Sequence, residues 1–146
     1  MDKAYTHSMI DINMSVNQIK GGLVQMAKKY GINYHEMVLM YHLYSNGDCT
    51  QKQICDCYLL PKQTVNNIVT AMKEAGNIEW YFTATNKKEK VLKITEKGLA
   101  YISNLVLSMD NTEKTIASVM GDEKMATLVE LLTEYNNIIK SAVADI

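Results

Sequence analysis

Apolar side chains recur every three or four residues over most of the chain, so the pattern predicts a mainly helical protein. The first such stretch predicts a helix over residues 2–30 that ends at Gly31, because glycine commonly terminates helices. Residues 35–45 are apolar on nearly every side, which predicts a buried central helix. A further long stretch, from Thr95 toward Met120, predicts another helix with Thr95 as its cap.

The last stretch of the chain carries an apolar stripe. Gly121 is expected to stop the preceding helix, and Asp122 is expected to cap the final one. Near-heptad spacing of apolar residues is typical of helices that pack lengthwise against another helix. The residues of the stripe are Met125, Leu128, Leu131, Leu132, Tyr135, Ile138, Ile139 and Ala142.

Residues 50–98 predict a different arrangement, which begins with two short helices. Thr50 and Gln53 stand three positions apart and fit a capping box, so Thr50 is expected to start a helix. Pro61 suits the first position of a second helix, and Gly76 is expected to end it. The segment therefore predicts a helix-turn-helix.

The second of these helices, over residues 61–75, has two distinct faces. Its apolar residues have the spacing of a core-facing stripe: Val65, Ile68, Val69 and Met72. Polar residues occupy the other side: Gln63, Asn66, Asn67, Thr70 and Lys73. A helix anchored on one face and polar on the other suits the major groove of DNA, because Asn and Gln amides can pair with adenine.

A β-hairpin is predicted after the second helix. Two β-prone runs, Ile78–Phe82 and Val91–Ile94, flank a polar tip that contains Lys87, Lys88 and Lys90. A projecting wing of this kind typically lies along the DNA backbone or enters the minor groove. Helix, turn, helix and basic hairpin in this order indicate a DNA-binding protein.

Charge and composition agree with DNA contact by one face of a single domain. The chain has 146 residues and a formal net charge of −1, which fits one domain. Residues 50–97 hold eight lysines and five acidic residues, a net charge of +3, and the rest of the chain has −4. All fifteen basic residues are lysines, so bidentate arginine contacts to guanine are excluded.

These elements give a set of predicted DNA-binding residues. Residues at the start of the first short helix are expected to hold phosphate, because free N–H groups point outward there. Amides of the second helix are expected to reach bases, and the lysines to contact phosphates. The set comprises Thr50, Gln51, Lys52, Lys62, Gln63, Thr64, Asn66, Asn67, Thr70, Lys73, Asn86, Lys87, Lys88 and Lys90.

The order and spacing of these residues resemble the MarR (multiple antibiotic resistance regulator) family of winged-helix repressors. The matching stretches read TQKQIC, LLPKQTVNNIVTAMKEAGNI and NKKEKVLKITEKG, and the flanking helices fit as well. The resemblance implies a homodimer whose terminal helices interlock and whose winged lobes read a palindromic operator. One departure lies in the wing, where Asn86, Lys87 and Lys88 replace the family's usual acidic residue followed by arginines.

The expected fold is mainly α-helical with a small β-hairpin wing. We expect one domain, 1–146, with a winged helix-turn-helix lobe at 34–98 and dimerisation helices at 1–33 and 99–146. The terminal helices carry apolar stripes that need burial, and a two-fold dimer suits a palindromic site. A monomeric six-helix bundle is the alternative.

Tyrosines and histidines gather in and before the central helix. His35 and His42 stand seven residues apart on one face. The resemblance places an effector crevice between the dimer helices and the winged lobe. We interpret the cluster as its lining, with core packing as the alternative. Its members are Tyr30, Tyr34, His35, Tyr41, His42 and Tyr44.

Three cysteines fit a reducing compartment better than a disulfide framework. Cys55 and Cys57 are two apart on a predicted helix, so their side chains point to different sides. Cys55 is expected to be buried and unreactive, where the resemblance places a small residue under the recognition helix. A thiol sensor would use Cys49 or Cys57, the two thiols that are expected to be exposed.

The sequence predicts a cytoplasmic DNA-binding regulator and no enzyme. Catalytic constellations and metal-ligand spacings are absent from the sequence, and no cofactor is expected. The first residues lack the basic start, apolar core and cleavage site of a signal peptide, and no apolar run of about 18 residues occurs, so neither a leader nor a membrane span is expected. The predicted function is a homodimeric repressor of a palindromic A/T-rich operator, released by a small-molecule effector. The alternatives are a thiol-sensing regulator and a winged-helix protein-interaction module that does not read DNA.

Overall fold

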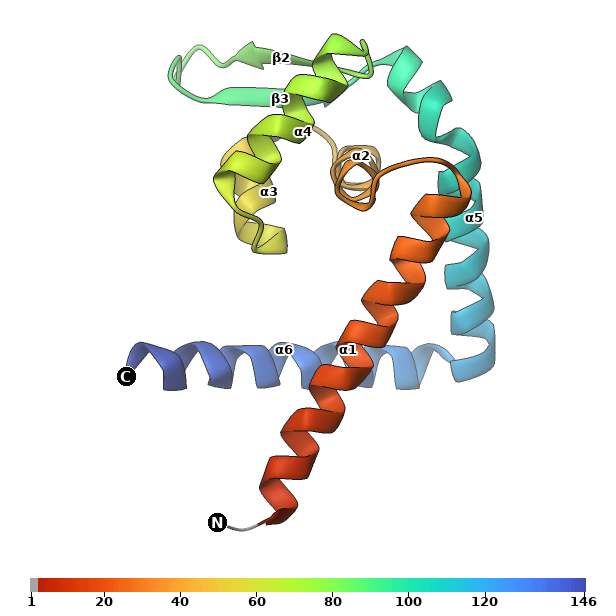
Figure 1. Ribbon diagram of the computed structural model, residues 1–146, viewed down its shortest axis with the longest axis vertical. Coiled ribbons are helices and arrows are strands. Elements are labelled where there is room, and N and C mark those ends of the chain that lie inside the picture. The colour runs from red at the N-terminus through yellow and green to blue at the C-terminus, as the bar shows by residue number, and fades with distance from the viewer. Residues whose placement is uncertain (1–2) are drawn as a thin grey trace. The chain divides into compact units, whose positions relative to one another are not determined.

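The computed structural model describes residues 3–146, with side chains described from residue 8 onward (Figure 1). Helices predominate and one small antiparallel sheet accompanies them, which confirms the predicted fold class. No helix in this described part is long and apolar enough to cross a membrane. The elements are α1 (Lys3–Lys29), α2 (Tyr34–Asn46), β1 (Cys49–Thr50), α3 (Gln51–Tyr58), α4 (Lys62–Glu74), β2 (Ile78–Phe82), β3 (Lys90–Ile94), α5 (Glu96–Met120) and α6 (Asp122–Ala144).

The chain forms two compact units, and their boundary lies inside α5. The first unit, here called the winged unit, ends at Val106 and contains the sheet and the helices from α1 to the first half of α5. The second, here called the C-terminal unit, comprises Leu107–Ile146, which is the rest of α5 followed by α6. The predicted helix-turn-helix and its hairpin thus belong entirely to the winged unit.

Helix ends in the winged unit follow local sequence signals. Gly31 and Gly76 adopt positive φ angles of 66° and 77° after α1 and α4, as expected of glycines that end helices. The predicted capping box at Thr50 and Gln53 is present at the start of α3. A second capping box, formed by Asn33 with Glu36, starts α2 and was not predicted.

Two predicted helix starts are wrong by one residue. Pro61 is the residue before α4 and not its first helical residue. Asp122 does not cap α6, because Gly121 occupies the cap position and Asp122 is the first helical residue. Asp122 still places a carboxylate in the first turn, where the helix dipole favours negative charge. Thr95 caps α5 as predicted, because its Oγ1 accepts a hydrogen bond from the Gly98 amide at 3.0 Å.

The sheet has three antiparallel strands in the order β1-β3-β2. The predicted hairpin is present: Trp80 of β2 pairs with Leu92 of β3, and Phe82 pairs with Lys90. Strand β1 was not predicted, because a strand of two residues has no periodicity to detect. In β1, Cys49 pairs with Leu92. The sheet therefore joins the start of the helix-turn-helix to the hairpin.

The core of the winged unit is formed by side chains from its helices and its sheet. Helix α4 contributes Val65, Val69 and Met72 as predicted, while Ile68 is half-buried. Helix α2 is not buried all round, because Tyr44 near its end is exposed. The remaining core residues are Ala27, Ile32, Met37, Val38, Leu39, Met40, Leu43, Cys49, Ile54, Ile78, Leu92, Ile102, Leu105 and Val106.

A close backbone contact joins the start of α5 to the end of the helix-turn-helix. A Cβ atom on Gly98 would lie 2.0 Å from the carbonyl oxygen of Asn77. That oxygen accepts a hydrogen bond from the Thr95 amide at 3.1 Å, and Thr95 Oγ1 donates to the Gly76 carbonyl at 2.7 Å. Only glycine fits at position 98 without displacing the Asn77 backbone.

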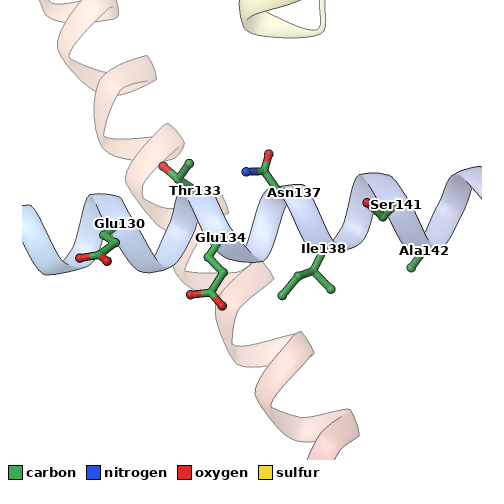
Figure 2. A pocket seen from close by; sticks show the side chains of 7 residues that line it. All are labelled: Glu130, Thr133, Glu134, Asn137, Ile138, Ser141 and Ala142. Atoms are coloured by element: carbon green, nitrogen blue, oxygen red, sulfur yellow. The ribbon is translucent and has the colours of Figure 1, made fainter.

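The C-terminal unit leaves its apolar residues exposed or half-buried. None of the residues of α6 is buried in the single chain. Leu131 and Ile138 of the predicted stripe are 58% and 59% exposed. Figure 2 shows the side chains that line a pocket on this helix, all of them from α6 itself, Ile138 among them.

Candidate DNA-binding surface

A groove of about 720 Å³ lies between the helix-turn-helix and the hairpin tip. In Figure 1, α4 runs beside the hairpin, and the loop between β2 and β3 extends past it. Most residues that line the groove belong to the predicted DNA-binding set. The lining consists of Gln51, Lys52, Cys55, Lys62, Asn66, Asn86, Lys88, Glu89 and Lys90.

The groove carries four lysines and one acidic residue, Glu89. Lys52 also forms an ion pair with Asp56, at 2.9 Å between Nζ and Oδ2, one turn further along α3. The hydrogen bond to Asp56 raises the pKa of Lys52. Both partners are well exposed, so solvent screens this pair and a phosphate can compete for the ammonium group. The groove therefore carries net positive charge and suits a polyanion.

The outer face of α4 presents its amides as an ordered pair. Gln63 Nε2 donates a hydrogen bond to Asn67 Oδ1 at 2.8 Å, and both residues are exposed. This bond leaves the Gln63 carbonyl and the Asn67 NH₂ group free, one acceptor and one donor group. Asn66 lies on the groove side of the helix. The side chains are thus placed as a recognition helix requires.

Thr50 and Thr70 use their hydroxyl groups within the protein. Thr50 Oγ1 accepts from the Gln53 amide at 3.2 Å as the cap of α3. Thr70 Oγ1 donates to the Asn66 carbonyl at 2.9 Å, which occupies its proton inside the helix. Thr50 keeps its proton for a phosphate, whereas Thr70 has only lone pairs left. Of the two predicted contacts, Thr50 is the better placed to donate.

The wing tip is held by Asn86. Its amide N–H donates to Thr83 Oγ1 at 3.1 Å, and its Oδ1 accepts from the Lys88 amide at 3.0 Å. Its Nδ2 contacts Glu89 Oε2 at 3.4 Å. These bonds shape the turn that carries the exposed side chains of Lys87 and Lys88. Asn86 therefore orders the wing, and it also lines the groove, where a DNA contact is predicted.

Lys73 and Lys90 both lie against the ring of Trp80. Lys73 Nζ is 3.3 Å from the ring centroid, and Lys90 Nζ is 4.1 Å from it. Trp80 was not among the predicted site residues, and neither were Cys55 and Glu89 of the groove. Their roles depend on contacts between elements, for which the sequence pattern has no local signal.

The predicted DNA-binding residues thus divide into two groups. Those in the groove come from α3, α4 and the hairpin: Gln51, Lys52, Lys62, Asn66, Asn86, Lys88 and Lys90. The others lie outside its lining, on the outer face of α4, at the cap of α3 or at the wing tip: Thr50, Gln63, Thr64, Asn67, Thr70, Lys73 and Lys87.

The predicted effector cluster is arranged as ring pairs on α2. The rings of Tyr34 and His35 are 5.5 Å apart, and those of Tyr41 and Tyr44 are 6.1 Å apart. His42 instead packs edge-on against Tyr58, the last residue of α3, at 5.5 Å. Tyr58 was not predicted, because it lies outside the sequence cluster. The remaining member, Tyr30, is exposed after the end of α1.

The imidazole of His42 lies in a partly buried polar contact. Its Nδ1 is 3.0 Å from the hydroxyl oxygen of Tyr58. Burial lowers the pKa of His42, because a low-dielectric site disfavours the charged form. Burial likewise raises the pKa of Tyr58. Both side chains are therefore neutral near pH 7.

The cysteines differ from two of the predictions. Cys49, expected to be one of the exposed thiols, is buried in β1, and burial raises its pKa to about 11. Cys55, expected to be buried, is half-buried and lines the groove. Cys57 is exposed, as expected. A buried thiol with a raised pKa is a poor nucleophile, so Cys49 has the character of a core residue.

Comparisons with known proteins agree with this architecture. The family model described as MarR family matches residues 30–86, from the end of α1 to the wing tip. The chain is 24% identical over 104 residues to the HTH-type transcriptional regulator MhqR of Bacillus subtilis (strain 168), covering 71% of this chain and 72% of MhqR.

Two solved structures show how far the fold extends. A MarR family regulator from Neisseria meningitidis has a TM-score of 0.85 and 24% identity, with 94% of this chain and 97% of that chain covered. NadR in complex with 4-hydroxyphenylacetate has a TM-score of 0.76 and 21% identity, with 85% and 91% covered. At such identities the likeness concerns the fold, and it includes the helices on both sides of the winged region.

Proposed function

Because the chain belongs to the MarR family of transcriptional regulators, we propose that it is a homodimeric, sequence-specific repressor that binds a palindromic, A/T-rich operator. The observation that carries the proposal is the groove between α3, α4 and the wing. It gathers four lysines beside an outward-facing amide of the helix placed to read bases. The chain offers amides and lysines in place of arginines, which favours adenine over guanine as the base that is read.

The proposed division of labour follows from side-chain chemistry. Gln63, Asn66 and Asn67 would contact base edges in the major groove, because amides donate and accept together. Lysines would neutralise phosphates along the groove and the wing. The first turn of α3 would hold one phosphate with its N–H groups and with Lys52.

The dimer is proposed on the exposed apolar residues of the outer helices. On α1, Val16 and Ile19 are 48% and 62% exposed on one side of the helix, and α6 has no buried residue. A second copy that packs on these stripes would bury them and would relate two winged units by a two-fold axis. The two recognition helices would then meet half-sites about one helical turn apart.

We propose that the effector binds at the predicted effector cluster on α2. Tyr41 and His42 provide half-buried rings with polar ends, and Tyr58 adds an exposed one, which together suit an aromatic ligand that carries a hydroxyl group. NadR binds a ligand of this kind, 4-hydroxyphenylacetate. Titration of the protein–operator complex with that compound is the first test. Release of the operator that is abolished in Tyr58→Ala would support this site.

Selection of bound duplexes from a random-sequence library tests DNA recognition. We expect a two-fold-symmetric A/T-rich motif, and recovery of no motif would contradict the proposal. The variant Lys87→Gln/Lys88→Gln/Lys90→Gln should lower the slope of log affinity against log salt by roughly 0.9 for each phosphate that is no longer neutralised. Lys114→Gln/Lys124→Gln/Lys140→Gln is the matched control, because it removes three lysines from the C-terminal unit and should leave the slope unchanged.

The same variants address the alternative of a protein-interaction module. If the wing does not contact DNA, the wing variant and the control variant will have the same affinity and the same salt dependence as the wild type. That outcome would replace the proposed function with protein binding by the winged unit.

A further inference from the structure

Trp80 is the only tryptophan of the chain and lies in β2, next to the end of the recognition helix. It is half-buried, and its cross-strand partner Leu92 is fully buried. Along the same face of the hairpin, Lys90 pairs with the residue two positions after Trp80. Lys73 reaches the same ring from the last turn of α4. One ring therefore contacts a lysine from each of the two elements that flank the DNA-binding groove.

The two ammonium groups lie within the distance at which a cation is attracted to the electron-rich face of an indole. Lys73 Nζ is 3.3 Å and Lys90 Nζ is 4.1 Å from the Trp80 ring centroid. Tryptophan gives the strongest such interaction among the aromatic residues. The ring therefore restricts two long side chains that would otherwise sample many rotamers.

A ring holds a cation without neutralising it, and this distinguishes Trp80 from a carboxylate. Among the described side chains, the only ion pair with a nitrogen–oxygen distance within 4.0 Å joins Lys52 to Asp56. Neither Lys73 nor Lys90 is therefore paired with a carboxylate. Lys73 and Lys90 are thus placed by Trp80 while their charges remain available to a phosphate. A side chain that is ordered before DNA arrives loses less entropy on binding.

We propose that Trp80 is a positioning residue of the DNA-binding surface, which fixes the ammonium groups of Lys73 and Lys90 for contact with the phosphate backbone. This inference rests on the proposed function. It adds a coupling between the last turn of α4 and the wing, because both lysines depend on one ring. The competing interpretation is that Trp80 only packs on Leu92 and that the lysines reach DNA without it.

The first experiment examines the free protein and needs no DNA. Protons over an aromatic ring shift upfield in the NMR spectrum, so the ε-methylene protons of Lys73 and Lys90 should be shifted in the wild type. The shift should disappear in Trp80→Leu, while Lys87 and Lys88 serve as unshifted controls. Unshifted signals for both Lys73 and Lys90 in the wild type would overturn the inference.

The second experiment is a double-mutant cycle on affinity for the selected operator. Trp80→Leu should weaken binding about five- to tenfold, the effect of one or two exposed cation–π contacts. In the Lys73→Gln/Lys90→Gln background, the same substitution should change affinity less than about twofold, because no cation is left to hold. Equal reductions in both backgrounds would assign Trp80 a packing role only and would overturn the inference.

A third experiment preserves the shape of the side chain. Because the chain has one tryptophan, growth with fluorinated tryptophans labels Trp80 alone. Fluorine withdraws electron density from the ring face and weakens cation–π attraction at nearly constant volume. Affinity for the operator should fall stepwise with the number of fluorine atoms in the wild-type background. It should stay constant across the series in the Lys73→Gln/Lys90→Gln background. This series tests the positioning role of Trp80 even if Trp80→Leu does not fold.

The outcomes separate this inference from the proposed function. A wild-type protein that shows no operator binding would overturn both. Normal wild-type binding together with unchanged affinity in Trp80→Leu and in the fluorinated series would overturn the positioning role alone.

Discussion

The winged unit and the C-terminal unit use their apolar residues in opposite ways. In the winged unit, helices and sheet enclose a core in which Met40 and Leu92 are fully buried. In the C-terminal unit, Leu131 and Ile138 are more than half exposed, and α6 buries no residue. Periodic apolar patterns in a sequence therefore do not say whether a stripe is buried within the chain or against another molecule.

The difference in burial between the two units indicates two separate roles, DNA binding by the winged unit and association by the C-terminal unit. The winged unit closes its own core, so its groove and recognition helix are held in place by side chains of the same unit. The C-terminal unit has a surface in need of a partner, and a second copy of the chain is the partner proposed. Substitutions in the two units should therefore have different consequences, on association in one and on folding or DNA binding in the other.

The largest effect is expected from charges placed in the α6 stripe. Leu131→Glu/Ile138→Glu should lose about 2 kcal/mol of apolar-burial free energy at each position of each chain, about 8 kcal/mol for the dimer, so the dissociation constant should rise roughly 10⁵- to 10⁶-fold. Sedimentation equilibrium would measure it, and circular dichroism should show the winged unit still folded. Thr127→Glu/Asn136→Glu, at exposed polar positions of the same helix, is the matched control. A wild type that is monomeric at micromolar concentration would contradict the dimer.

A smaller effect is expected from Gly98→Ala in the winged unit. The new Cβ would lie 2.0 Å from the Asn77 carbonyl oxygen. The backbone must move, and overpacking of this kind costs about 3 kcal/mol of unfolding free energy. Denaturant unfolding measures the change. Gly22→Ala in α1, where an added Cβ meets no atom within 4 Å, should cost nothing or stabilise the helix. Equal stability of the two variants would show that the packing at Gly98 is not tight.

Base recognition should be impaired without unfolding in Asn66→Ala and Asn67→Ala. Each base contact that is removed should cost about 1–3 kcal/mol of binding free energy for the selected operator. Affinity for random duplex should change little, because phosphate contacts remain. Fluorescence anisotropy on both duplexes gives the specificity ratio. Asn137→Ala in α6 is the control, and an unchanged ratio in all three variants would remove α4 as the reading element.

The smallest effect concerns the pH dependence of stability. Burial lowers the pKa of His42 in the folded protein, so the unfolded chain takes up this proton first as the pH falls. His42 should contribute stability above its ordinary pKa near 6.5, and this contribution should be lost as the pH falls toward the lowered value. Urea unfolding at pH 7.5 and 5.5 should show a smaller decrease in His42→Gln than in the wild type. A variant with the same pH dependence as the wild type would exclude His42 as the cause.

Much of the fold could be predicted because its signals are local. Gly31, Gly76 and the capping box at Thr50 act within one helical turn, so a short stretch of sequence contains their physics. The two faces of α4 likewise follow from spacing along one helix. Strand β1 escaped prediction because its two residues become a strand only when they pair with β3.

The candidate site was predicted in part for the same reason. Spacing along the chain identified the helix-turn-helix and the lysine-rich wing. Glu89 in the groove, Trp80 under two lysines and Tyr58 against His42 depend on contacts between elements that are not adjacent in sequence. The predicted burial of Cys49 and Cys55 is wrong, because a cysteine behaves as a small apolar residue whose burial depends on tertiary packing.

The sequence by itself determined where the helices end, which face of α4 carries apolar anchors and where the hairpin lies. These features arise from hydrogen bonds and periodicity within a few residues. Only the tertiary structure decided which polar side chains share one groove, which ring holds Lys73 and Lys90, and which apolar stripes stay exposed. Packing brings together segments that are distant in the sequence. Which side chains are buried, and which charges lie close enough to interact, is therefore settled only in the folded arrangement.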